Sequence, residues 1–390
     1  MHKIFSLAIS ALLFVACSDD SGKLSAAEHE SSSSSATVAI PVDYSQGRAM
    51  NTRLGRGINL GNSWDSKYYG GDVPDEPYNF GYNDGLDNAW GNAIQNGDFE
   101  IIKKSGFQSV RIPVRWQHNS NPITHEVNPE RLAGVIEDVE QAIAAGLTVI
   151  VDFHHYQELM NAGNNFSNDP AAYEAEKSHF LAIWTQVATA LNVFPDSMLA
   201  LEILNEPLFN STDVLNDIML SAYHVIRSAA PGKTILFESY HAAKFADLTV
   251  LKLPQDGNII YSGHYYEPYT FSHEGHGYTC KGDETYSVSV SSDMAQYVAL
   301  ARSLYPDVNG GHIPMNMGEF GVAAGSRSSC GTNGPSDKYF ALWSKKVVAA
   351  AEKYDLSWHY WGFTKVGGFE AYDRNNNRYY PGILEALMQQ

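Results

Sequence analysis

Two glutamates stand where apolar segments end, and their placement suggests acid–base chemistry. The segment LEILNEP, residues 201–207, begins like a buried strand and ends in Asn205, Glu206 and Pro207. A plain turn is satisfied by Gly, Asn or Asp, so the glutamate needs another explanation. A second apolar segment, PMNMGEF at residues 314–320, places Glu319 near its end. Two such carboxylates facing each other are the equipment of a retaining glycosidase, in which one attacks the anomeric carbon and the other protonates the leaving oxygen.

Other reactive side chains also lie at the ends of strand-like segments. In chain order they are Asn59 and Asn62, Arg111, His154 and His155, Glu238, His264, Tyr266 and Glu267, and Trp361. Rigid elements hold catalytic groups more accurately than free loops do. The pattern therefore predicts that several strands deliver these side chains to one site.

The elements that position these residues repeat one pattern, an apolar strand followed by an amphipathic helix. Strands are predicted at 56–62, 109–114, 148–155, 200–207, 234–239, 258–268, 314–320 and 357–363. Helices are predicted between them, for example at 129–145, 171–191, 213–229, 292–304 and 337–354, and Gly106 and Gly146 stand where helices should end. Eight such units predict an α/β fold, a closed (β/α)₈ TIM barrel whose strand ends meet at one mouth. An open doubly wound sheet is the alternative, but no correctly spaced phosphate loop follows the first strand.

Composition supports one large domain and excludes some partners. The chain has 390 residues, of which 44% are hydrophobic, and a formal net charge of −18. An acidic chain repels phosphate backbones, so we expect no nucleic-acid partner and no binding to anionic membrane surfaces. A neutral ligand remains compatible with this charge.

The N-terminus predicts export. A basic start precedes an apolar run from Ile4 to Ala16, too short to span a membrane. We expect a signal peptide at 1–16, a lipidated Cys17, a flexible Ser-rich tether at 17–44 and a catalytic domain at 45–390. Phe14 departs from the usual lipoprotein box, so an ordinary signal peptide cut nearby is the alternative. The predicted location is secreted, or the surface or outer membrane of a bacterium, with the lipid anchor as the sole membrane contact.

The remaining cysteines, Cys280 and Cys330, form a single pair in an exported chain. An oxidising compartment favours a disulfide between them. Two free thiols are the alternative.

Several motifs together resemble glycoside hydrolase family 5, a family of retaining endoglucanases. They are LEILNEP, VRIPVRW, DFHHY, HYYEPY, MGEFG and the late Trp361, while GINLGNSWDS and NAWGNA resemble its cellulase and xyloglucanase branch. The resemblance covers roughly residues 54–387 and finds every motif in the family's order. One such motif alone would be weak, but together they are specific.

The resemblance implies a role for each residue. Glu206 would be the acid/base and Glu319 the nucleophile. Asn59 and Asn205 would bind the substrate, Asn205 through a sugar 2-hydroxyl. Arg111 and Tyr266 would orient the nucleophile, which suits a carboxylate that needs a cation and a hydroxyl donor. His154 and His264 would bind the sugar astride the cleaved bond, and Trp361, followed by a cis peptide bond, would form the platform beneath it. His155, next to His154, is a further candidate for substrate binding.

Alternative chemistries find less support. Strand alternation should point only one of His154 and His155 into the mouth, which disfavours a metal site, and no His-Glu-x-x-His motif occurs. The segment DRNNNR, residues 373–378, lacks the glycine of a calcium loop, and no Gly-x-Ser-x-Gly elbow is present. We therefore expect no metal and no cofactor.

Aromatic residues near the mouth are candidate sugar platforms. Trp64, Trp90 and Trp116 are predicted either to stack on sugars or to pack within loops. The expected function is a monomeric endo-β-1,4-glucanase acting on cellulose, mixed-linkage β-glucan or xyloglucan. The same mechanism on β-mannan or xylan, a non-catalytic carbohydrate-binding barrel and a metal-dependent hydrolase are the alternatives.

Overall fold

The computed structural model describes residues 39–66, 89–273, 289–324 and 335–389 of the chain. The predicted signal peptide, Cys17, Cys280 and Cys330 lie outside these residues, as does most of the predicted tether. Ala39–Gln390 form one compact unit. Within the described ranges, no helix has both the length and the apolar character needed to cross a membrane.

Eight parallel strands close into a barrel, which confirms the predicted fold and excludes the open sheet. Each strand pairs with the next along the chain, and β8 pairs with β1. Because both faces of the strands are covered, they appear in the sequence as almost continuous apolar runs. The strands are β1 (Arg56–Asn59), β2 (Ser109–Val114), β3 (Thr148–Phe153), β4 (Leu199–Glu202), β5 (Thr234–Glu238), β6 (Ile259–Tyr265), β7 (Met315–Phe320) and β8 (Ser357–Tyr360).

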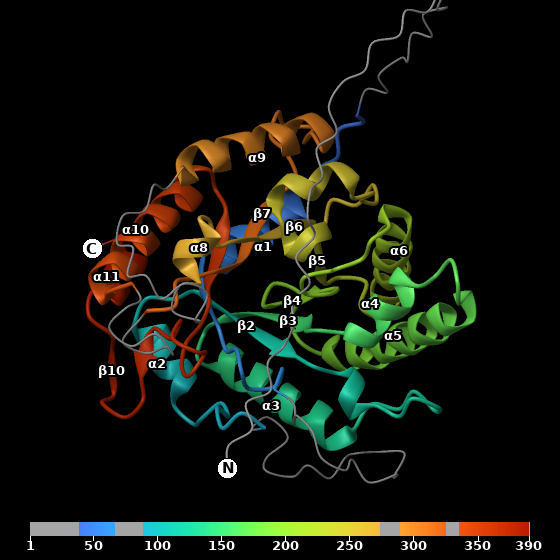
Figure 1. Ribbon diagram of the computed structural model, residues 1–390, viewed down its shortest axis with the longest axis horizontal. Coiled ribbons are helices and arrows are strands. Elements are labelled where there is room, and N and C mark those ends of the chain that lie inside the picture. The colour runs from blue at the N-terminus through green and yellow to red at the C-terminus, as the bar shows by residue number, and fades with distance from the viewer. Residues whose placement is uncertain (1–38, 67–88, 274–288, 325–334, 390) are drawn as a thin grey trace, which may run out of the picture. The chain divides into compact units, whose positions relative to one another are not determined.

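Helices lie around the strands (Figure 1). Asn128 caps α3 by accepting hydrogen bonds from two backbone N–H groups, and Asp169 caps α5 in a similar way. Gly106 and Gly146 have φ angles of 100° and 83°, a conformation that ends a helix, as predicted. The longer helices are α1 (Ser45–Leu54), α2 (Asp98–Lys104), α3 (Pro129–Ala144), α4 (Gln157–Asn164), α5 (Pro170–Leu191), α6 (Thr212–Ala229), α9 (Val290–Leu304) and α10 (Asp337–Lys353).

Short elements complete the mouth loops and the C-terminal region. They are η1 (Gln117–Asn119), α7 (Tyr240–Ala243), η2 (Phe245–Val250), α8 (Tyr269–Ser272), β9 (Tyr372–Asp373), β10 (Arg378–Tyr379) and α11 (Ile383–Leu387). Although α7 is short and helical in its hydrogen bonding, His241, Ala242 and Ala243 have φ angles of 51°, 59° and 58° and form a left-handed turn.

Helix α1 closes the barrel at the amino ends of the strands. Met50 and Leu54 pack in one buried cluster with residues of four strands, namely Ile150, Ala200, Leu236 and Ile260. Two residues that the sequence assigned to the tether contact the barrel domain: Tyr44 is 1% exposed, and the Val42 N–H donates to the Pro306 carbonyl. The open mouth is therefore at the carboxyl ends of the strands.

Most of the strands end earlier than the sequence predicted, which changes how the site is built. Strand β4 ends at Glu202, so Asn205 and Glu206 lie in the following loop rather than at a strand tip. Strand β3 likewise ends at Phe153, before the two histidines. Glu206 and His155 have φ angles of 48° and 59°, and such left-handed residues cannot continue a pleated strand.

Candidate active site

A cavity of about 370 Å³ lies at the carboxyl ends of the strands. Its walls include most of the predicted site residues, namely His154, His155, Asn205, Glu206, His264, Tyr266, Glu319 and Trp361. The walls also include residues to which the sequence analysis gave no role, among them His241, Lys244, Phe245, His273, Tyr297 and Phe369. The structure therefore gathers side chains from distant parts of the chain around one space.

Glu206 and Glu319 face each other across this cavity. A carboxylate oxygen of Glu206 lies within 4.8 Å of one of Glu319, with a ring nitrogen of His264 within the same distance of both. The Glu206 side chain is 28% exposed and that of Glu319 only 7%. A register shift between β6 and β7 places His264 directly beside Glu319.

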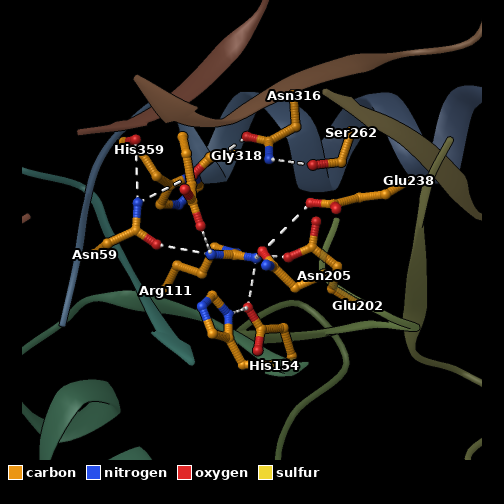
Figure 2. A network of polar contacts seen from close by, with 12 residues as sticks. Asn59, Arg111, His154, Glu202, Asn205, Glu238, Ser262, Asn316, Gly318 and His359 are labelled. Atoms are coloured by element: carbon orange, nitrogen blue, oxygen red, sulfur yellow. Dashed lines mark hydrogen bonds and ion pairs between the residues drawn. The ribbon is translucent and has the colours of Figure 1, made fainter. Parts of the chain in front are cut away.

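Arg111 lies at the centre of a buried polar network (Figure 2). Its Nη2 lies 2.5 Å from Asp152 Oδ2, and its Nε donates to Glu202 Oε2 at 2.6 Å. The other guanidinium contacts are 3.0 Å from Nη1 to Asn59 Oδ1, 3.0 Å from Nη1 to Glu319 Oε1 and 2.7 Å from Nη2 to Asn205 Oδ1. A planar donor held at so many points is fixed in position, and it fixes its acceptors in return.

Glu319 receives hydrogen bonds on both oxygens. Arg111 Nη1 donates to Oε1, and the Tyr266 hydroxyl donates to Oε2 at 2.9 Å. The cation and hydroxyl donor expected near the nucleophile are thus both present. These two donors orient the Glu319 carboxyl group, which lines the cavity.

Glu206 is held from another direction. His264 Nδ1 lies 2.9 Å from Glu206 Oε1, and the backbone N–H of Glu206 donates to Glu238 Oε2 at 2.6 Å. His264 Nε2 also lies 2.9 Å from Glu238 Oε1, and its Nδ1 is 3.6 Å from Glu319 Oε2. The His264 imidazole therefore lies among three carboxyl groups.

The crowding of charge shifts the pKa values of the buried groups. Burial alone would lower the pKa of His264, but the negative charges of Glu238 and Glu319 raise it well above its ordinary value. Burial raises the pKa of Asp152 to about 7 and that of Glu238 to about 8. Burial also opposes ionisation of Glu202, but the Arg111 charge and hydrogen bonds lower its pKa below the ordinary value.

The pKa values of the two facing glutamates shift in opposite directions. Burial raises the pKa of Glu319 even though His264 and Arg111 act to lower it. Burial acts in the same direction on Glu206, but the hydrogen bond and charge of His264 lower the pKa of Glu206 overall. Two carboxylates so close titrate as a pair, and the directions of the shifts favour the ionised form of Glu206 over that of Glu319.

Both histidines after β3 line the cavity, so the prediction that only one does was wrong. Alternation stops at Phe153, and the left-handed φ of His155 turns the chain. The His154 ring is parallel to that of Trp361, with an interplanar angle of 2° and ring centroids 5.7 Å apart. Burial lowers the pKa of both histidines well below the ordinary value.

Trp361 is half-buried and forms part of the cavity wall. The Trp361–Gly362 peptide bond is cis, as the resemblance implied. Across from the indole, Gly61 has no Cβ, and a Cβ there would lie 2.5 Å from the ring. A glycine at this point lets the backbone approach the platform closely.

Four predicted substrate contacts do not line the cavity. Trp116 is fully buried, and Trp64 is 5% exposed with its Nε1 donating to Asp138, so neither offers a face to a sugar. Asn59 is fully buried and does not line the cavity; it accepts from Arg111 and donates to backbone carbonyls such as that of Gly318. Trp90 is half-buried and also lies outside the cavity wall.

Glu206, His264 and Glu319 are the one group of three potential metal ligands found among the described residues. Their facing atoms are already engaged: His264 contacts Glu206, and Glu319 accepts from Arg111 and Tyr266. The raised pKa of His264 favours its protonated form, which repels a cation. The arrangement favours proton transfer over metal binding.

Sequence reasoning missed Asp152 and Glu202, the buried acids that neutralise Arg111. Each is a single acid within an otherwise apolar strand. A carboxylate in such a place must be paired, because an unpaired buried charge is costly. That signal could have identified both acids as partners of Arg111.

Comparisons with known proteins agree with this geometry. The family model described as Cellulase (glycosyl hydrolase family 5) matches residues 73–366. Endoglucanase A of Paenibacillus barcinonensis is 26% identical, with 99% of this chain and 98% of that protein covered. Endoglucanase H of Acetivibrio thermocellus is 26% identical over 70% of this chain, but the chain spans only 26% of that relative's length.

Solved structures are similar over most of the fold. Cel5A of Thermotoga maritima in complex with cellobiose superposes with a TM-score of 0.71 at 28% identity, covering 87% of this chain and 99% of that one. The same protein has been solved in complex with mannotriose.

Proposed function

The chain belongs to glycosyl hydrolase family 5, and from that premise we propose that it is a retaining endo-β-1,4-glucanase acting on cellulose, mixed-linkage β-glucan or xyloglucan. The observation that carries the mechanism is the separation of the two glutamates, whose nearest oxygens lie within 4.8 Å. Inverting enzymes need about 6.5–9.5 Å between carboxyl groups to admit a water, whereas retaining enzymes need about 5–5.5 Å.

In the first step, a Glu319 oxygen attacks the anomeric carbon as the glycosidic C–O bond breaks. Glu206 gives its proton to the leaving oxygen, which departs as an alcohol. The product is a glycosyl ester on Glu319 with inverted configuration. Arg111 and Tyr266 hold the Glu319 carboxyl group in place for this attack.

In the second step, a water molecule attacks the anomeric carbon from the opposite face. Glu206, now a carboxylate, accepts the water proton, and Glu319 leaves as a carboxylate. Two inversions restore the β-configuration. The His264 contact with Glu206 stabilises the carboxylate form that this step requires.

The first step requires a proton on Glu206, whereas, despite burial, the hydrogen bond and charge of His264 lower the pKa of this carboxyl group. Substrate binding supplies the change. Glu206 is 28% exposed and loses more water to an incoming sugar than Glu319, which is 7% exposed. Desolvation raises the pKa of a carboxyl group, so a bound sugar moves the proton toward Glu206.

Two further features suit a sugar ligand. Asn205 Nδ2 is buried and has no hydrogen-bond partner in the described part of the protein, which leaves it able to donate to a sugar hydroxyl at the cavity. Trp361 offers the half-buried aromatic face on which a sugar ring can stack.

The anomeric outcome tests the mechanism. ¹H NMR of the first minutes of cellopentaose hydrolysis should show the β-anomer as the initial product, followed by mutarotation. An initial α-anomer would refute double displacement. The polysaccharide preference is tested separately with soluble glucans, xyloglucan, mannan and xylan, using reducing-end release.

Variants test the two roles. Glu206→Gln on a dinitrophenyl β-cellobioside should give a burst followed by slow turnover, and azide should restore turnover with a β-glycosyl azide as product. Glu319→Ala should give no burst, and azide should yield the α-glycosyl azide. Each variant should lose at least about 10²-fold in activity on polysaccharide, which is the lower end of the range for removing a positioned acid or base. The opposite pairing of azide products would exchange the two assignments.

A second substrate class has specific support. The similar Cel5A of Thermotoga maritima binds mannotriose as well as cellobiose. The same site geometry would therefore serve β-mannan if its walls accept an axial 2-hydroxyl. In the polysaccharide panel, mannan hydrolysis at a rate comparable to that of β-glucan would support this second activity.

A further inference from the structure

Glu238 is a buried carboxyl group that the double-displacement steps do not use. It is the last residue of β5, it is fully buried, and it does not line the cavity. A bound sugar in the cavity would therefore not touch it. Its contacts nevertheless converge on the glutamate proposed as acid/base.

Each Glu238 oxygen reaches Glu206 by a different route. Oε2 accepts the backbone N–H of Glu206 at 2.6 Å. Oε1 lies 2.9 Å from Nε2 of His264, whose Nδ1 lies 2.9 Å from Glu206 Oε1. Arg111 is more distant, with Nη2 at 3.7 Å from Glu238 Oε1.

The backbone of Glu206 needs such support. Its φ of 48° is in the left-handed region, which a residue with a side chain adopts at a cost. Conformations of this kind persist where the surroundings hold them and occur often at functional sites. The short contact from the Glu206 N–H to Glu238 supplies a direct restraint on this peptide.

We propose that Glu238 is a positioning residue for the acid/base Glu206, holding its main chain directly and its side chain through His264. The inference rests on the proposed function, because it assigns Glu238 to the acid half of that mechanism. With Oε1 of Glu206 facing His264, Oε2 has no protein partner among the described residues and is left for the glycosidic oxygen. Glu238 thus selects which oxygen carries the transferable proton.

A carboxyl group suits this role because both of its oxygens have lone pairs. Oε1 can lie 2.9 Å from the charged His264 Nε2 while Oε2 accepts the Glu206 N–H. A glutamine in its place has one acceptor oxygen and one amide nitrogen that only donates. Glu238→Gln must therefore lose either the restraint on the Glu206 peptide or the contact with protonated His264.

The leaving group distinguishes an acid-positioning role from general support. We compare kcat/KM for dinitrophenyl β-cellobioside, whose leaving group needs no proton, with that for cellotetraose, whose leaving group does. Glu238→Gln should lower kcat/KM for cellotetraose about 10-fold or more. The reason is that an error of about 1 Å in the placement of a catalytic group can cost about 10²-fold in rate. On the dinitrophenyl substrate the loss should stay below about 3-fold, because acid catalysis contributes little there.

Glu202→Gln is the matched control. Glu202 is equally buried on the neighbouring strand β4, but it binds Arg111, which holds Glu319. Glu202→Gln should therefore reduce kcat/KM for both substrates by similar factors. Should Glu238→Gln fail to fold, Glu238→Asp keeps the charge but withdraws it by one methylene, and it should show the same dependence on the leaving group.

The outcomes separate this inference from the function on which it rests. Equal losses on both substrates for the Glu238 variants would overturn the positioning role. If Glu206→Gln itself shows no dependence on the leaving group, Glu206 is not the acid, and the proposed mechanism fails together with this inference. Dependence on the leaving group in Glu206→Gln and Glu238→Gln, and its absence in Glu202→Gln, would support both.

Discussion

Replacing Arg111 by methionine should destabilise the protein in a way that depends strongly on pH. The side chain is fully buried and contacts Asp152 at 2.5 Å, Glu202 at 2.6 Å and Glu319 at 3.0 Å. Methionine is unbranched and uncharged, and it fills part of the space of the arginine stem. The variant therefore leaves three buried carboxyl groups without their common cation.

The size of the effect follows from this geometry. Removing one partner of a buried ion pair costs about 3–5 kcal/mol, because the other charge remains buried. For the compact unit Ala39–Gln390, an unfolding entropy of about 2.1 cal/mol/K per residue gives about 0.7 kcal/mol/K. A loss of about 5 kcal/mol at alkaline pH should therefore lower Tm by about 7 °C.

The pH dependence follows from the direction of the pKa shifts. In the native protein the pKa of Glu202 is lowered, so Glu202 contributes stability above its unfolded pKa that is lost as pH falls. Without Arg111, burial raises the pKa of Glu202 instead, and stability is lost as pH rises. Burial already raises the pKa of Asp152 to about 7, so its cost also grows with pH. The difference in Tm between native protein and variant should thus be larger at pH 8 than at pH 5.

Differential scanning calorimetry at the two pH values measures this difference. Lys233→Met is the control: Lys233 is also fully buried and contacts Asp196 at 2.5 Å, but that Asp196 side chain is 55% exposed. Its loss leaves no buried carboxylate, so the Tm decrease should be nearly the same at both pH values. If Arg111→Met lowers Tm by the same amount at pH 5 and pH 8, the reasoning from uncompensated buried carboxylates is wrong.

Three further outcomes are expected. Tyr266→Phe removes the 2.9 Å donor to Glu319, so kcat/KM should fall about 10- to 100-fold on activated and natural substrates alike, as expected for a hydrogen bond to a charged group. Bound substrate removes water from Glu206 and so raises its pKa. In the pH profiles, the alkaline limb of kcat should therefore lie at higher pH than the alkaline limb of kcat/KM, and coincident limbs would contradict this. Trp361→Ala should raise KM for cellotetraose, whereas Trp116→Phe, at a fully buried position, should lower Tm without changing KM.

The sequence predicted the barrel because strand and helix periodicity are local properties. The glycines that end helices, Gly106 and Gly146, are also local signals, and the structure confirms their positions. Side-chain directions beyond the strand ends could not be predicted in this way. His155 leaves the strand in a left-handed conformation, so alternation no longer decides where its ring points.

Burial near the mouth was equally hard to predict. Trp116 and Trp361 both follow strands, but one is fully buried and the other lines the cavity. The difference depends on residues far away in the chain: Trp116 Nε1 donates to the Asp152 carbonyl, whereas Trp361 lies against Gly61 and His154. No local pattern distinguishes these two environments.

The buried network explains why the site is both rigid and costly. Two basic groups, Arg111 and His264, lie among five acids: Asp152, Glu202, Glu206, Glu238 and Glu319. The acids outnumber the basic groups, and burial raises the pKa values of Asp152 and Glu238, which favours their neutral forms. Replacing such a network by apolar side chains would often increase stability. Its presence here is better explained by the chemistry. Two glutamates must be held at a fixed separation while a proton moves between one of them and the substrate. Fixed charges and hydrogen bonds can hold them in this way without occupying the cavity.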